Sequence, residues 1–111
     1  MLAQSGARTP EELETLLEDA LVVRDPVGLA TLFDDDSMLV AEGKHPSRGG
    51  DEAARGALAL WDAARPYLAA PRQVVVTRDL ALILGEHGVN VMRRDRDGAW
   101  HYAIVWQAGY E

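Results

Sequence analysis

The stretch from Leu80 to Ala108 is rich in apolar residues and is interrupted by two turn signals. Asp97-Gly98 predicts a tight hairpin turn, because a two-residue turn needs positive φ angles that Gly and Asp tolerate. His87-Gly88 predicts a second turn, although His tolerates positive φ less well. Together with the valine-rich segment Gln73–Thr77, the pattern predicts a meander of four antiparallel strands.

Pairing these strands sorts their side chains onto two faces of one sheet. Across the C-terminal turn, Met92 is expected opposite Ala103. Across the N-terminal turn, Leu84 is expected opposite Val91. One face is large and apolar and carries Leu80, Leu82, Leu84, Val89, Val91, Trp100, Tyr102, Ile104 and Trp106. The other mixes small and hydrogen-bonding residues, as a cavity lining does, and carries Ala81, Ile83, Gly85, Asn90, Met92, Arg94, His101, Ala103, Val105 and Gln107.

Three helices are predicted before these strands. Thr9 caps the first and Pro10 occupies its first position. Its apolar stripe is Leu13, Leu16, Leu17, Ala20 and Val23. Asp25-Pro26 ends this helix and caps a short second one, because Pro disfavours the helical conformation just before it. The third helix is expected over Glu52–Arg65, with Pro66 as its stop signal.

The order of elements indicates an α+β fold, with three N-terminal helices packed on a strongly curved, mostly antiparallel sheet. Between the second and third helices, Ser37–Glu42 predicts a short strand. Gly43–Gly50 predicts a loop or an irregular edge strand. Residues 1–8 are expected to be a loose terminus, and residues 9–111 a single domain.

Composition agrees with one globular domain and excludes several kinds of partner. The chain has 111 residues, of which 48% are hydrophobic and 26% charged. A formal net charge of −7 argues against nucleic-acid or anionic-membrane partners. Without cysteine there is no disulfide or thiolate chemistry, and a cytoplasmic location is expected. No apolar run approaches the ~18 residues of a membrane span, and no secretory leader is expected.

Four segments follow one another in an order and spacing known from other proteins. They are Arg24–Ser37, Gly49–Glu52, Val74–Leu82, and Val91–Arg94 with Asp97–Tyr102. Together they resemble the SnoaL-like members of the NTF2-like superfamily, whose cone-shaped architecture is also called cystatin-like. The resemblance implies a pocket for a small apolar molecule inside the cone, between the helices and the sheet.

The same resemblance allows a comparison with ketosteroid isomerase, which uses a carboxylate base and two hydrogen-bond donors. Aligned on this chain, the base would fall on Ala41, beside Glu42. The donor tyrosine would fall on Leu17 and the donor aspartate on Asn90. Only Asn90 can still donate, so the isomerase mechanism is not expected. The hairpin over residues 80–91 is also shorter, which implies a shallow or open cavity.

The expected ligand pocket is lined by Leu17, Leu58, Trp61, Asn90, Met92, His101, Ala103 and Val105. Among these, His101 and Asn90 are the candidates for proton transfer and for orienting a ligand. The alternative for them is a polar cluster at the rim of the sheet. Trp61 is either a pocket wall or a core residue.

The resemblance favours binding of a small apolar molecule. A lyase, isomerase or cyclase acting on a polyketide- or steroid-like substrate is one alternative, and a non-catalytic interaction module is another. The sequence leaves open whether the protein is an enzyme. Neither a metal nor a cofactor is expected. Asp34-Asp35-Asp36 with Glu42 is interpreted as a solvated acidic turn, because oxygen-only metal sites need several converging carboxylates.

A homodimer through the sheet is the expected assembly. The resemblance implies that the mixed face lies against the helices and that the large apolar face is exposed to water. The size of the apolar side chains alone would favour the opposite orientation. An exposed apolar face can be covered by its own copy about a two-fold axis. The expected interface residues are Val91, Trp100, Tyr102, Ile104 and Trp106.

Overall fold

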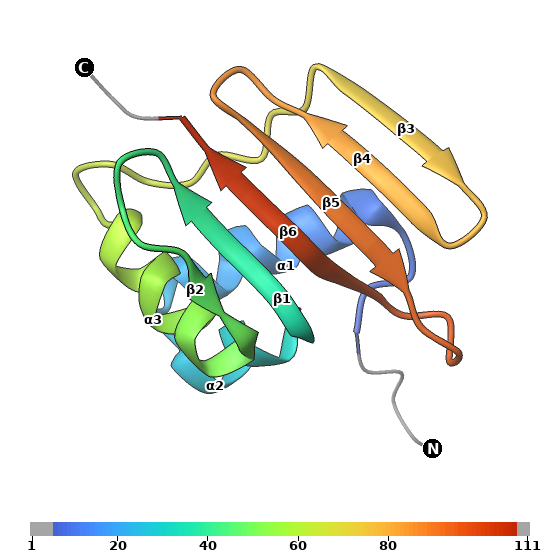
Figure 1. Ribbon diagram of the computed structural model, residues 1–111, viewed down its shortest axis with the longest axis horizontal. Helices are drawn as coiled ribbons and strands as arrows, with labels where there is room; N and C mark the ends of the chain where they lie inside the picture. Colours follow the sequence, from blue (N-terminus) through green and yellow to red (C-terminus); the bar gives the residue numbers. More distant parts are fainter. Residues whose placement is uncertain (1–5, 109–111) are drawn as a thin grey trace.

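The computed structural model describes residues 6–108 as three helices and one curved, open six-stranded sheet (Figure 1). The helices are α1 (Pro10–Val22), α2 (Pro26–Thr31) and α3 (Gly49–Leu60). The strands are β1 (Phe33–Ala41), β2 (Ser47–Arg48), β3 (Gln73–Thr77), β4 (Leu80–Leu84), β5 (Gly88–Arg94) and β6 (Trp100–Gln107). Their order in the sheet is β2-β1-β6-β5-β4-β3, with β1 parallel to β6 and the other described pairs antiparallel. The predicted α+β class is confirmed.

The predicted starts of the first two helices are confirmed by their caps. The Thr9 hydroxyl accepts a hydrogen bond from the backbone N–H of Glu12 at 3.0 Å. The Asp25 carboxylate accepts one from the backbone N–H of Gly28 at 3.1 Å. Each cap satisfies a backbone donor that the first turn of a helix leaves unpaired.

The predicted end of the third helix is wrong, because α3 stops at Leu60 and Trp61 is already extended. The Arg24 guanidinium occupies the end of the helix. Its two terminal nitrogens donate to the carbonyl oxygens of Leu58 and Trp61, at 2.6 and 2.7 Å. These bonds satisfy carbonyls that a helix terminus leaves open. Pro66 therefore lies in the connector 61–72 that joins α3 to β3.

The strand predictions hold in part. β3 spans Gln73–Thr77, as predicted. β1 begins at Phe33 rather than at Ser37, so the acidic triplet predicted as a turn lies within the strand. The turn between β4 and β5 is formed by Glu86-His87, and Leu84 pairs with Val89 rather than with Val91. This two-residue shift keeps every side chain on its predicted face.

The β5–β6 turn is longer than the predicted two-residue turn. The Asp95 carboxylate accepts hydrogen bonds from the backbone N–H groups of Asp97 and Ala99, at 2.9 and 3.0 Å. The backbone N–H of Gly98 donates to the Asp95 carbonyl at 3.0 Å. Gly98 has a φ of 84°, which a residue with a side chain rarely adopts. The Asp95 side chain thus closes a wider turn and shifts the pairing near it by one residue.

A β-bulge in β6 compensates for this shift and corrects the predicted faces. Met92 pairs with Tyr102 instead of Ala103, whereas Val91 pairs with Ile104 as predicted. One extra residue reverses the alternation of side chains on one side of the bulge. Trp100 and Tyr102 are therefore buried, with 3% and 0% of their surface exposed, rather than lying on the large apolar face. His101, which lies between them, leaves the mixed face on which it was predicted.

The remaining face assignments agree with the burial pattern. The mixed face lies against the helices, where Ala81, Ile83, Met92 and Val105 join the core, and α1 passes behind the sheet (Figure 1). No helix within residues 6–108 covers the opposite face of the sheet, which we call the outer face (Figure 1). It carries Val75, Leu80, Ile104 and Trp106, each more than a third exposed.

Part of the segment predicted as a loose terminus belongs to the fold. Ala7 is buried, and its carbonyl accepts a hydrogen bond from the backbone N–H of Trp100 at 2.9 Å. Residues 1–5 and 109–111 lie outside the described residues. Within residues 6–108, no helix has the length and apolar character that a membrane crossing requires.

Candidate functional site

A carboxylate is buried on the inner side of α1. Glu14 shares this side of the helix with Leu13, Leu17 and Leu21 and is only 3% exposed. A buried carboxylate is costly unless hydrogen bonds replace its water. Buried charged groups of this kind are frequent at functional sites, so Glu14 and its neighbours are the candidate site.

Three side chains donate hydrogen bonds to this carboxylate. The Tyr67 hydroxyl donates to Oε1 at 2.5 Å. The Tyr102 hydroxyl and the Asn90 amide donate to Oε2, at 2.6 and 2.9 Å. Asn90 also donates to the Tyr67 hydroxyl oxygen at 3.1 Å. We call Glu14, Tyr67, Asn90 and Tyr102 the Glu14 cluster.

The two tyrosines of the cluster are held in their neutral, donating form. Burial raises the pKa of the Tyr67 and Tyr102 hydroxyls above the ordinary value of 10.0. The charge of Glu14 raises both pKa values further, because a second negative charge beside it is unfavourable. The cluster is thus one acceptor surrounded by neutral donors.

The connector 61–72 brings Tyr67 to α1. Its ring packs edge-on against Trp61, with 4.8 Å between ring centroids. Two residues further on, the backbone N–H of Ala69 donates to the Glu18 carboxylate at 2.8 Å. Glu18 lies one turn after Glu14, so the same side of α1 holds the connector at two points. Figure 1 shows the connector running along the upper end of the sheet.

A cavity of about 640 Å³ lies between this connector and the β4–β5 turn. Glu14, Tyr67 and Asn90 line it on the side of the cluster. Trp61 and Ile83 form apolar parts of its wall. Its size falls within the range of about 300–1,000 Å³ that is typical of small-molecule sites.

The structure places two of the eight predicted pocket residues on this cavity, namely Trp61 and Asn90. Most of the others are packing residues between the helices and the sheet. They are Leu17, Met92, Ala103 and Val105, which are buried, and Leu58, which is partly buried against the core.

The eighth, His101, is not brought together with Asn90. It lines a separate hollow of about 980 Å³ near the β5–β6 turn. Its Nδ1 lies 3.1 Å from the Thr31 carbonyl oxygen and its Nε2 lies 2.9 Å from the Asp95 carboxylate. The two ring nitrogens therefore lie against a backbone carbonyl of α2 and a carboxylate of the turn. His101 therefore has a carboxylate partner that its sequence position did not suggest, and it ties α2 to the turn.

Sequence reasoning missed Glu14 and Tyr67. The signal for Glu14 was present, since it precedes Leu17 by three positions and Leu21 by seven, on one helix side. Tyr67 gave no comparable signal, because it lies in an irregular connector. Among the described residues, no three His, Asp or Glu side chains are placed to hold a metal ion.

Comparison with known proteins identifies the fold. No protein-family model and no curated protein sequence matches the chain. A structure from Thiobacillus denitrificans, provisionally described as a calcium/calmodulin-dependent protein kinase type II association domain, is similar over 97% of this chain and 100% of that chain, with 17% identity and a TM-score of 0.75. A ketosteroid isomerase-like protein from Erwinia carotovora atroseptica is similar over 91% and 93%, with 18% identity and a TM-score of 0.66.

A third structure, from Streptomyces avermitilis, is provisionally described as a dehydratase from the NTF2-like family. It covers 90% of this chain and 92% of its own, with 19% identity and a TM-score of 0.66. The chain therefore has the NTF2-like fold, also called cystatin-like. At these identities the likeness establishes the architecture, and the function has to be argued from the site.

Proposed function

We propose that the protein binds a small, largely apolar molecule in the cavity between the connector 61–72 and the β4–β5 turn. The observation that carries this proposal is the Glu14 cluster, which combines a buried charge with a cavity. Taking a carboxylate out of water costs free energy that its hydrogen bonds only offset, so fold stability alone does not account for a charge at this position. Its position on the wall of a cavity with apolar sides favours a role in orienting a ligand.

A cavity-filling substitution tests this proposal with a matched control. Ala64 lines the cavity, whereas its neighbour Ala63 is exposed and does not. Cyclohexylmethanol, titrated into ¹⁵N-labelled protein, should shift the amide resonances of the cavity residues. Ala64→Trp should abolish these shifts and Ala63→Trp should preserve them. Shifts that survive Ala64→Trp, or that map to other surfaces, would contradict the proposal.

A lyase-, isomerase- or cyclase-type enzyme acting on a polyketide- or steroid-like substrate is the second candidate. Two of the compared structures are described as ketosteroid isomerase-like and, provisionally, as a dehydratase. The Glu14 carboxylate lines the cavity and is the group that would accept a proton there. Incubating the protein with cyclohexyl methyl ketone in D₂O would reveal such chemistry as deuterium at the carbon next to the carbonyl. Exchange no faster in the unmodified protein than in Glu14→Gln would eliminate this candidate.

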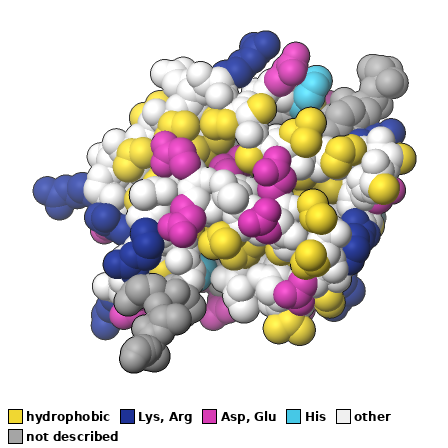
Figure 2. All heavy atoms as spheres, turned by 180° about the vertical axis from the view of Figure 1, so that it is seen from behind, with side chains coloured by type: hydrophobic (Ala, Val, Ile, Leu, Met, Phe, Trp, Pro, Cys, Tyr) yellow, Lys and Arg dark blue, Asp and Glu magenta, His cyan; other side chains and the backbone are white. Residues whose placement is uncertain are grey.

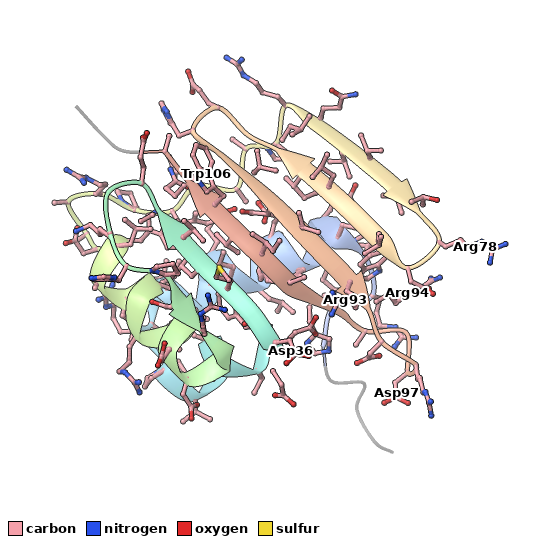
Figure 3. All side chains as sticks on the ribbon, in the orientation of Figure 1. Asp36, Arg78, Arg93, Arg94, Asp97 and Trp106 are labelled. Carbon is pink, nitrogen blue, oxygen red and sulfur yellow. The ribbon has the colours of Figure 1, made fainter. Side chains whose placement is uncertain are left out.

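Self-association is a further proposal, and it concerns a different surface. The outer face presents Val75, Leu80, Ile104 and Trp106 to solvent. The charged residues Asp36 and Arg93 lie toward the other end of the sheet from Trp106 (Figure 3). An apolar centre with charges at its margin is the usual arrangement of an interface. One compared structure is provisionally described as an association domain, which also supports this proposal.

A further inference from the structure

Building on the proposed function, we infer that the cavity selects a ligand whose polar head donates hydrogen bonds, specifically a protonated amine on a compact apolar body. The basis is the direction of the hydrogen bonds in the Glu14 cluster. Every donor hydrogen of the cluster already forms a hydrogen bond within it. Toward the cavity, the cluster can therefore only accept hydrogen bonds.

The donors can be followed one by one. A tyrosine hydroxyl has one hydrogen, and those of Tyr67 and Tyr102 both point to Glu14. The Asn90 amide has two hydrogens, which go to Glu14 and to the Tyr67 oxygen. The opposite orientation of this amide would bring its oxygen to 2.9 Å from a carboxylate oxygen, so the network fixes the orientation.

The acceptors have capacity left. A carboxylate can accept about four hydrogen bonds, and Glu14 accepts three. The amide oxygen of Asn90 has no hydrogen-bond partner within residues 6–108, and it is not among the fully enclosed unpaired atoms. Glu14 and Asn90 both line the cavity, so a donor that enters it meets two open acceptors.

The charge of Glu14 favours a cationic donor over a neutral one. No Lys, Arg or His in the described part of the chain forms an ion pair with Glu14. Glu18 lies one turn away, and its charge also acts on Tyr67. Figure 2 shows acidic side chains gathered in the middle of the side of the molecule along which α1 runs. A protonated amine would supply the missing countercharge, whereas a carboxylate head would be repelled.

The other charged groups of the cavity lie at its rim. Arg72 and Glu86 are 3.8 Å apart, and both side chains are mostly exposed. Arg65 and His87 also line the rim and are exposed. Salt and water screen charges at such positions far more than at Glu14. The aromatic rings of Trp61 and Tyr67, inside the rim, favour a cation further.

This polarity is opposite to that of an isomerase site. There, donors stabilise a developing oxyanion, so the site suits a carbonyl oxygen. Here the donors all point at a protein carboxylate, and a ligand carbonyl would find no free donor within the Glu14 cluster. A ketone of the same size should therefore bind more weakly than an amine.

Four probes with one apolar body test this inference. Cyclohexylmethylamine, cyclohexylmethanol, cyclohexyl methyl ketone and cyclohexanecarboxylate are titrated separately into ¹⁵N-labelled protein at pH 7 and fixed salt, where the amine is protonated as lysine is. We expect the amine to bind at least about tenfold more tightly than the ketone, because hydrogen bonds to charged groups are the strong ones. The alcohol should fall between them, and the carboxylate should not saturate. Ala64→Trp should remove the shifts, which separates cavity binding from binding to the acidic surface.

Glu14→Gln removes the charge at nearly constant size and should bring the amine and the ketone within about threefold of each other. If this variant does not fold, the ranking in the unmodified protein decides alone. Equal affinities for the four probes, or tightest binding of the ketone or the carboxylate, would overturn the donor preference while leaving the proposed ligand cavity intact. Absence of cavity shifts with all four probes would contradict both.

Discussion

Glu14 illustrates what sequence reasoning can reach at the scale of a single residue. The Thr9 and Asp25 caps follow from local chemistry, and the structure confirms both. In the sequence, Glu14 looks like one more solvated acid after Glu11 and Glu12. Its three partners follow it by 53, 76 and 88 residues. No local pattern links residues that far apart, so only the folded chain identifies the site.

Removing one donor should weaken the fold measurably. Tyr102→Phe keeps the ring but leaves Glu14 with two hydrogen bonds instead of three. We expect the free energy of unfolding to fall by about 1.5–3 kcal/mol, the range for hydrogen bonds to charged groups. Urea denaturation followed by circular dichroism measures it. Thr15→Ala, which removes an exposed hydroxyl with a 3.3 Å bond within α1, is the control and should change little. An equal decrease in the free energy of unfolding in both variants would mean that the hydrogen bond to Glu14 stabilises the fold no more than the exposed one.

Alkaline titration should show that Tyr67 and Tyr102 have higher pKa values in the folded protein than in the unfolded chain. Burial first, and then the Glu14 charge, raise the pKa of Tyr67 and Tyr102 in the folded protein. A pKa raised by folding contributes stability that is fully present below the unfolded value near 10 and is lost as pH rises through the folded value. Absorbance at 295 nm should therefore show these two tyrosines ionising only with unfolding. The Tyr67→Phe and Tyr102→Phe variants assign the signal. Reversible ionisation near pH 10 in the folded protein would contradict the cluster.

At the scale of elements, the alternation of side chains predicted the faces of β4 and β5 and of β6 beyond its bulge. It failed for Trp100, His101 and Tyr102 because Asp95 closes a longer turn, which alternation alone does not reveal. The third helix ends before its predicted last residue because of a contact that local sequence also does not reveal. The Arg24 side chain, distant in sequence, takes the carbonyl groups at the end of α3.

Arg24 should therefore stabilise the end of α3 and the start of the connector. Arg24→Ala removes two hydrogen bonds and should lower the free energy of unfolding by about 1.5–3 kcal/mol, because the donor is charged. Hydrogen exchange of the Trp61 amide, which donates to Ala57, should accelerate in this variant. Arg55→Ala, which removes an exposed arginine of α3, is the matched control. Unchanged exchange at Trp61 in Arg24→Ala would show that the connector is held by other contacts.

At the scale of the whole molecule, the predicted class and the orientation of the mixed face agree with the structure. The predicted interface does not survive unchanged, because Trp100 and Tyr102 are buried inside the protomer. Val91, Ile104 and Trp106 remain on the outer face. Val75 and Leu80 extend the surface across the neighbouring strands. Complete burial of a large apolar side chain is worth roughly 1.5–3 kcal/mol, so covering the exposed part of each of these side chains would contribute a fraction of that.

We expect the protein to form a homodimer through this face. Sedimentation at micromolar concentration should give about twice the chain mass of 12.1 kDa. Ile104→Asp would place a charge within the interface and should yield monomer. Val27→Asp, on an exposed valine of α2, is the matched control and should remain dimeric. A 12.1 kDa species for the unmodified protein would exclude the dimer.

A crystal structure grown with cyclohexylmethylamine would show whether the cavity binds a ligand. We predict density for the amine between the connector 61–72 and the β4–β5 turn, with its nitrogen within hydrogen-bonding distance of Glu14 or Asn90. Tyr67 and Tyr102 should still donate to the carboxylate. A connector packed onto Ile83 with the cavity closed, or density for the amine only on the outer surface, would contradict ligand binding in this cavity.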